Sequence, residues 1–194
     1  MLQAKLQCFI SVATEVEPFL ELHQADRPLL PFLAQDLGSL IKSLMTSIVK
    51  EEVMEKTTAL SAYNVKFEEN LKDPSKVDVG FSAKRSILSV TASDKARYAF
   101  RMECREFIKC LLKKLFAKAP ITYTLVRSLS WLNPCKIASP DEKDRTRASK
   151  HLEQTLHIMC DSGRVKPEKC DSIKRQFTSL CEDVLANNSD IQVI

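Results

Sequence analysis

Residues 93–120 constrain the fold of this chain most strongly. Their apolar side chains recur at steps of three and four positions, so at about 100° per residue they fall on one face of an α-helix. These side chains are Phe100, Cys104, Phe107, Ile108, Leu111 and Leu115. Thr91 or Ser93 can cap the first turn, and Pro120 ends the pattern. We therefore predict a long helix here, with one face in a hydrophobic core.

Two segments nearer the N-terminus carry the same periodicity. The first predicts an amphipathic helix with a kink or a break at Pro18, because proline lacks the amide that would bond to Thr14. Its apolar face consists of Leu2, Leu6, Phe9, Ile10, Ala13, Val16 and Leu20. The second follows Pro28 and Pro31 and must pack on a neighbouring helix. Its apolar stripe consists of Leu30, Leu33, Leu37, Leu40, Ile41, Leu44 and Ile48.

Weaker patterns complete the helical prediction. Residues 50–59 continue the second helix or form a separate one, and residues 81–90 and 121–132 each predict a short helix. Between them, residues 60–80 lose the periodicity and form either a surface linker or a binding loop.

The C-terminal third of the chain carries clear helix start and stop signals. Ser139 is the predicted N-cap of a helix with Pro140 at its first position, and Gly163 is placed to cap its end. Trp131, the only tryptophan, is expected to anchor the core. A last helix is predicted to start near Pro167.

Glycine content also favours helices. The chain has 194 residues and only three glycines, whereas sandwiches and nucleotide-cradling folds need many glycine turns. A chain of this length suits one domain. We therefore predict an all-α fold, an irregular bundle of about seven helices, with a single domain over residues 1–186 and a frayed tail over residues 187–194.

Charge and cysteine content bound the environment. A formal net charge of +4 permits a nucleic-acid partner without requiring one. Seven cysteines, an odd number without paired spacing, favour reduced thiols inside a cell. No apolar run approaches the roughly 20 residues that cross a bilayer. We expect a soluble, intracellular protein without a membrane partner.

The candidate binding surface is a basic row on the outer flank of the helix predicted at residues 93–120. The row consists of Arg101, Arg105, Lys109 and Lys113, each four residues from the last. Evenly spaced cations that stay in water can follow a phosphate backbone, so the row predicts a nucleic-acid contact. The alternative is an ordinary solvated helix face, because no aromatic residue interleaves the row as a stacking platform.

The sequence offers no constellation for catalysis. His157, Cys160, Cys170 and Cys181 cluster along the chain, but they lack the Cys-x-x-Cys spacing of structural zinc sites. Cys170 and Cys181 also fall on the apolar stripe of their helix, where a free cysteine is an ordinary small hydrophobe. No motif places a nucleophile in an activated turn, and no phosphate loop occurs. We expect no enzyme activity, no metal, no cofactor and no small-molecule substrate.

Four stretches resemble a known family. They are EPFLELHQADRPLLPFLAQDLGSLIKSLM at residues 17–45, KVDVGF at 76–81, FRMECREFIKCLLKKL at 100–115 and VRSLSWLNP at 126–134. Together they are similar to hAT-superfamily transposases, in the all-helical segment that interrupts the RNase H-like catalytic fold of that family. The chain has no counterpart of that fold's strands or acidic triad, of the zinc-finger module or of the C-terminal dimerisation segment. No catalytic residue is therefore carried over.

The resemblance implies a transposon-derived helical fragment that lies near DNA, which favours the nucleus over the cytoplasm. The first hypothesis is a non-catalytic module that contacts nucleic acid through the basic row. The alternative is a module that binds partner helices or itself through leucine-rich surface. A third is a relic without a selected function.

Overall fold

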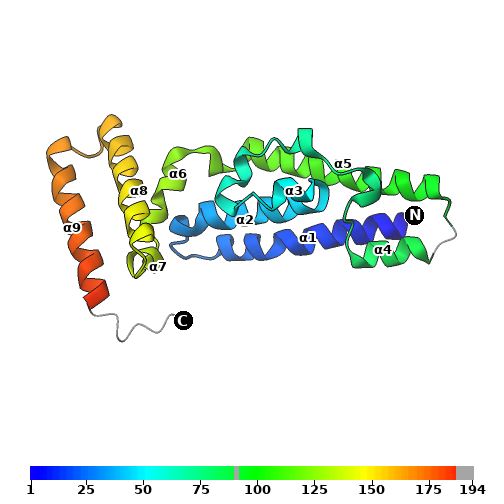
Figure 1. Ribbon diagram of the computed structural model, residues 1–194, viewed down its shortest axis with the longest axis horizontal. Coiled ribbons are helices and arrows are strands. Elements are labelled where there is room, and N and C mark those ends of the chain that lie inside the picture. The colour runs from blue at the N-terminus through cyan, green and yellow to red at the C-terminus, as the bar shows by residue number, and fades with distance from the viewer. Residues whose placement is uncertain (90–91, 187–194) are drawn as a thin grey trace. The chain divides into compact units, whose positions relative to one another are not determined.

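The computed structural model describes residues 1–89 and 92–186. Within these ranges the chain is all-α, as predicted, and contains no strand (Figure 1). Six helices of eight residues or more, close to the predicted seven, carry the architecture of the described chain. They are α1 (Leu2–Gln24), α2 (Leu30–Ile48), α4 (Phe81–Leu88), α5 (Asp94–Lys118), α8 (Glu142–Asp161) and α9 (Pro167–Ala186). The tail predicted at residues 187–194 lies outside the described residues, as does Thr91.

The described chain divides into two compact units. Unit 1 comprises residues 1–27 and 35–121, and unit 2 comprises residues 28–34 and 122–186. Each unit has its own cluster of buried apolar side chains. The single domain predicted from the sequence stays a prediction, because compactness does not say whether one unit folds without the other.

In unit 1, the axes of α1, α2 and α5 are roughly parallel, and α4 packs along α1 (Figure 1). The apolar stripes predicted for α2 and α5 enter the core, where Ile41, Phe100 and Ile108 are almost completely buried. Ser93 is the N-cap of α5, since its hydroxyl accepts a hydrogen bond from the Ala96 amide at 3.3 Å. The helix predicted at residues 93–120 is thus confirmed at its start and at its buried face.

Helix α1 forms as predicted, but the face that it buries is a different one. The large apolar residues of the predicted face are exposed: Leu2 by 82%, Leu6 by 56%, Phe9 by 54% and Ile10 by 45%. The buried face consists of Ala4, Cys8 and Val12. These smaller side chains let α1 approach α4 and α5 closely, which the spacing of large residues alone does not reveal. The helix also continues through Pro18 to Gln24, so the predicted break is absent.

Residues 60–80 pack against the core, so the surface-linker interpretation is wrong. The segment contains three short 3-10 helices, η1 (Ala59–Asn64), η2 (Phe67–Asn70) and η3 (Pro74–Lys76), and follows the separate short helix α3 (Glu51–Met54). Its buried side chains are Ala62, Phe67, Pro74, Val77 and Val79. An antiparallel bridge between Val49 and Leu71 also ties the segment to the end of α2.

Unit 2 is an α8–α9 hairpin with shorter helices against α8. These are α6 (Thr124–Ser128), η5 (Leu129–Leu132) and α7 (Pro134–Ile137). The single helix predicted at residues 121–132 is replaced by η4 (Pro120–Thr122), α6 and η5. The Trp131 ring meets the Phe177 ring edge-on, with centroids 5.5 Å apart, so tryptophan anchors this core as predicted.

The ends of α8 differ in how well the sequence predicts them. Asp141, not Ser139, is the N-cap, because its carboxylate accepts from the Lys143 amide at 2.9 Å. The Ser139 hydroxyl instead accepts from the Asp141 amide and donates to Asp144. Gly163 caps the other end with φ +70°, where its amide donates to the Cys160 carbonyl.

Candidate interaction surfaces

The first two cations of the predicted basic row face the folded segment at residues 66–80. The Arg101 guanidinium donates to the carbonyl oxygens of Ser75 and Val77. The Arg105 guanidinium donates to the carbonyl oxygen of Lys72 at 3.0 Å. Because guanidinium groups are strong, geometrically defined donors, these contacts fix residues 72–77 against α5.

The last two cations of the row pair with carboxylates. Lys113 lies 2.8 Å and Lys109 3.9 Å from Glu68, and Lys109 also lies 3.3 Å from Glu106. The hydrogen bond with Glu68 raises the pKa of Lys113 above its usual value. Side-chain exposure is only 19% for Arg105 and 22% for Lys109, against 49% for Lys113. The expectation that the row stays in water is therefore wrong for its middle members, although nucleic-acid binding by the row stays a prediction.

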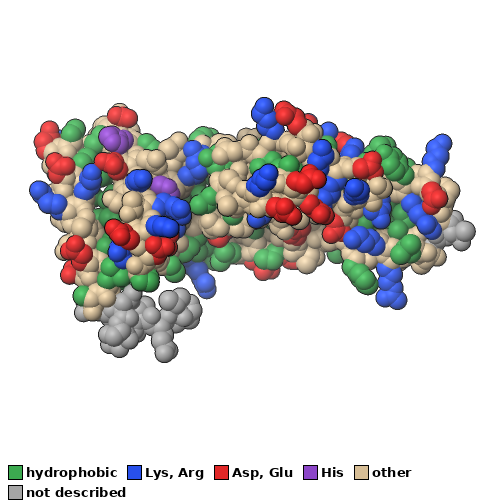
Figure 2. Space-filling model, viewed as in Figure 1, with side chains coloured by type: hydrophobic (Ala, Val, Ile, Leu, Met, Phe, Trp, Pro, Cys, Tyr) green, Lys and Arg blue, Asp and Glu red, His purple; other side chains and the backbone are tan. Residues whose placement is uncertain are grey.

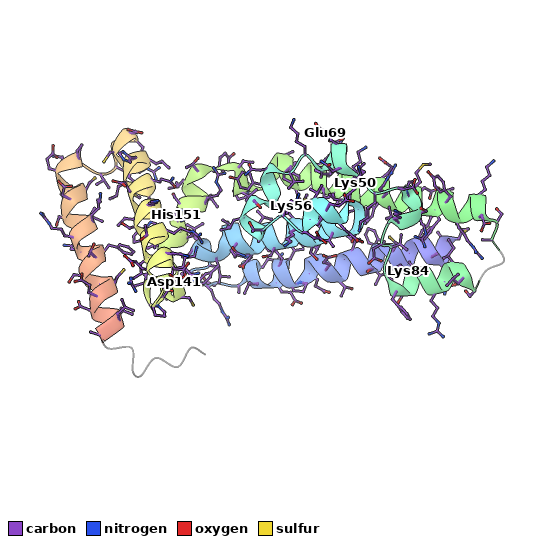
Figure 3. The ribbon with its side chains drawn as sticks, viewed as in Figure 1. Lys50, Lys56, Glu69, Lys84, Asp141 and His151 are labelled. Atoms are coloured by element: carbon purple, nitrogen blue, oxygen red, sulfur yellow. The ribbon has the colours of Figure 1, made fainter. Side chains whose placement is uncertain are left out.

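A second basic surface, on the outer side of α8, was not predicted. It consists of Lys143, Arg147 and Lys150, at steps of four and three residues and opposite the buried Leu152. Figure 2 shows basic side chains gathered over α8 beside a histidine, and Figure 3 labels His151 there. We call these three residues the α8 basic face. The same periodicity that revealed the row on α5 could have revealed it.

The charges of the α8 basic face are weakly compensated. Its one ion pair among the described residues joins Arg147 and Asp144 at 4.0 Å, and a hollow of about 350 Å³ lies along the face. Burial lowers the pKa of Lys136, on α7, and repulsion from Arg147 lowers it further. Burial likewise lowers the pKa of His151, with Lys136 and Arg147 adding to the effect. Arg147 is thus close enough to Lys136 and His151 to disfavour positive charge on them.

The exposed stripe of α1 forms one side of an apolar groove in unit 1. The groove has a volume of about 350 Å³ and an apolar floor of Leu2, Leu6, Cys8, Phe9, Cys104 and Phe107. The Phe9 and Phe107 rings lie 5.4 Å apart and connect α1 to α5. An ion pair between Lys5 and Glu103, both about half exposed, lies at its rim. This arrangement can receive an apolar helix without burying an unpaired charge.

Unit 2 contains a serine–histidine contact that no sequence motif predicts. Ser130 Oγ lies 2.6 Å from His151 Nδ1. Ser130 is only 6% exposed, and the charged groups that act on His151 are the cations Lys136 and Arg147. Nucleophilic catalysis instead uses an accessible serine and a carboxylate that stabilises the imidazolium. This contact is therefore a packing interaction, and the expected absence of enzyme activity stays a prediction.

The cysteines and histidines of α8 and α9 do not converge on one point. Within residues 1–89 and 92–186, no three His, Cys, Asp or Glu side chains are arranged to hold a metal ion. Cys181 lies in the core of unit 2, whereas the sulfur atoms of Cys160 and Cys170 approach to 3.2 Å. His157, Cys160, Cys170 and Cys181 are neighbours along the sequence, but the structure brings only Cys160 and Cys170 into contact.

No helix in the described ranges combines the length and the apolar character needed to cross a membrane. Comparisons with protein-family models, curated proteins and solved structures give no match. The resemblance to hAT transposases therefore stays a prediction, and the proposals below depend on the surfaces of the chain itself.

Proposed function

We propose that this chain is a non-catalytic helical interaction module that pairs with a second copy of itself through the apolar stripe of α1. The stripe consists of Leu2, Leu6, Phe9 and Ile10. The observation that carries the proposal is that these side chains are 45–82% exposed while a different face of the same helix is buried. Contiguous exposed apolar surface beside a groove is typical of a contact with another helix.

The charges at the rim favour a second copy over an unrelated partner. In a two-fold symmetric contact the same patch meets itself, so the patch must complement its own charges. Lys5 and Glu103 supply one cation and one anion at the rim of the groove, each about half exposed. Across a two-fold axis Lys5 of one copy can face Glu103 of the other, and the apolar stripes then meet in the middle.

Light scattering coupled to size-exclusion chromatography tests this proposal. One chain has a mass of 22.0 kDa, and we expect a species of twice that mass at both low and high salt, because apolar contacts are not screened. Replacing Leu6 by glutamine should shift the species to the monomer. The matched control is Leu180→Gln on α9, where a leucine of similar exposure lies in unit 2. A monomer under all conditions, or a dimer unaffected by Leu6→Gln, contradicts the proposal.

A second candidate function is contact with a nucleic-acid backbone through the α8 basic face. The supporting observation is that Lys143 and Lys150 are exposed and have no ion pair among the described residues, unlike the engaged row on α5. The resemblance to a DNA-associated family supports the same class of partner. Each phosphate contact made by a cation adds close to one unit to the slope of log affinity against log salt.

The two basic surfaces can be compared directly by exchanging their cations for glutamine. We expect the triple variant of Lys143, Arg147 and Lys150 to lose duplex DNA affinity and to reduce the salt slope by about two to three units. The matched control is Lys113→Gln on α5, where the lysine side chain is 49% exposed, and this variant should leave the slope unchanged. A loss of DNA affinity and of salt slope in Lys113→Gln, with the triple variant unchanged, would instead support binding by the basic row on α5.

Descent from a transposase is a separate proposal, supported by the stretches at residues 17–45, 76–81, 100–115 and 126–134. The genomic sequence on either side of the coding region tests it. Codons for the two halves of an RNase H-like fold are the expected finding. Flanks without such codons would remove the support for this origin.

A further inference from the structure

Two thiols of unit 2 meet beside the turn that connects α8 to α9. Cys160 is the penultimate residue of α8, and Cys170 lies in the first turns of α9. Gly163, with φ +70°, reverses the chain between them. The Cys160 and Cys170 sulfur atoms are 3.2 Å apart, so a disulfide of about 2.05 Å requires them to close by only about 1.2 Å.

The pair is accessible, whereas the other thiol pair of the chain is not. Cys160 and Cys170 are both half-buried. Cys8 and Cys104 in unit 1 are also hydrogen-bonded to each other, but they are only 2% and 5% exposed. An oxidant dissolved in water therefore reaches the first pair more readily than the second. The buried pair serves as an internal control with the same chemistry.

A hydrogen bond joins the two sulfur atoms, and either of them can be its donor. It is the main cause that raises the pKa of Cys160, and burial adds to it. The Cys170 sulfur also lies 3.8 Å from the carbonyl oxygen of Lys166, to which its thiol can donate.

From this geometry we propose that Cys160 and Cys170 form a dithiol site that a peroxide oxidises to a reversible disulfide linking α8 to α9. One thiol of the pair, as its thiolate, attacks one peroxide oxygen: a sulfur–oxygen bond forms, the oxygen–oxygen bond breaks, and the released hydroxide leaves as water after taking up a proton. The other sulfur then attacks the resulting sulfenic acid, and a second water leaves as the sulfur–sulfur bond forms. Two thiols lose two electrons, and one peroxide becomes two waters.

Equimolar hydrogen peroxide applied to the full chain tests the proposal. The chain has seven cysteines, so replacing the exposed Cys110 and Cys135 by serine leaves five and removes the two most exposed thiols that could link one molecule to another. We expect the thiols titrated in denaturant to fall by two, the mass to fall by about 2 Da, and peptide mapping to place the link between Cys160 and Cys170. Reduction with dithiothreitol should restore both thiols.

Two single variants test the link. With Cys160→Ser or Cys170→Ser we expect a sulfenic acid on the remaining thiol of the pair that dimedone traps, and no link between α8 and α9. Peptide mapping of the protein that keeps both thiol pairs decides the proposal even if a single variant does not fold. Oxidation of Cys160 and Cys170 to separate acids without a link, or linking of Cys8 to Cys104 at the same rate, would overturn it.

Discussion

Replacing Arg105 by glutamine tests whether the basic row of α5 stabilises the folded state. The Arg105 side chain is 19% exposed, and its guanidinium donates to the Lys72 carbonyl at 3.0 Å. A hydrogen bond to a charged group contributes about 1.5–3 kcal/mol. Glutamine is too short to reach that carbonyl. Because Arg105 Nε is buried without a hydrogen-bond partner, its removal offsets part of the loss, and we expect a cost of about 1.5–2 kcal/mol.

The matched variant is Lys113→Gln, two positions further along the same row. Lys113 is 49% exposed and pairs with Glu68 at 2.8 Å. Exposed ion pairs contribute about 0–1 kcal/mol, so this variant should cost clearly less than Arg105→Gln. Its cost should also shrink at high salt, whereas the cost of Arg105→Gln should persist, because the guanidinium–carbonyl contact is partly buried.

Urea unfolding followed by far-ultraviolet circular dichroism measures both free energies. The expected result is a lower midpoint for Arg105→Gln with little change for Lys113→Gln. The DNA affinity of each folded variant, measured in parallel, should equal that of the unaltered chain. Equal stability of all three proteins, together with a loss of DNA affinity in Arg105→Gln, would refute the stabilising role of Arg105 and support the row as a binding surface.

Three further predictions concern a close contact, a titration and the dithiol site. Gly38→Ala should cost about 1–3 kcal/mol in urea unfolding despite the better helix propensity of alanine, because a Cβ there would overlap the carbonyl of Ala59. The lowered pKa of His151 means that protons bind the unfolded chain more tightly, so thermal stability should fall as pH drops from about 6.5, and His151→Gln should flatten this dependence. The Cys160–Cys170 disulfide closes a loop of 11 residues, so peroxide treatment should raise the free energy of unfolding of unit 2 by about 3 kcal/mol, measured by calorimetry with and without dithiothreitol.

Local sequence rules predicted the helices because those rules act within one or two turns. The stripe of α2, the core face of α5, the Ser93 cap and the Gly163 cap depend on spacing and on residues next to one another in the chain. The confirmed all-α class follows from these elements, together with the scarcity of glycine.

The surfaces could not be predicted in the same way, because they depend on segments far apart in the chain. Residues 66–80 fold back on α5 and occupy the basic row, which no periodicity in either segment reveals. In α1 both candidate faces are apolar, and close approach of the neighbouring helices selects the small residues Ala4 and Cys8 over the larger Leu6. The predicted N-cap of α8 was wrong for a local reason, because Asp141 competes with Ser139 for the capping position.

Sedimentation equilibrium of the Leu2→Gln/Leu6→Gln variant tests the self-association of α1 most directly. Burying a leucine contributes about 2 kcal/mol, and these two are 82% and 56% exposed, so two copies lose at most about 5.5 kcal/mol of contact. Even half of that raises the dimer Kd about 100-fold. We predict this loss with the monomer still folded. An unaltered chain that sediments only as a 22.0 kDa monomer, or a variant with the same Kd, would contradict the account.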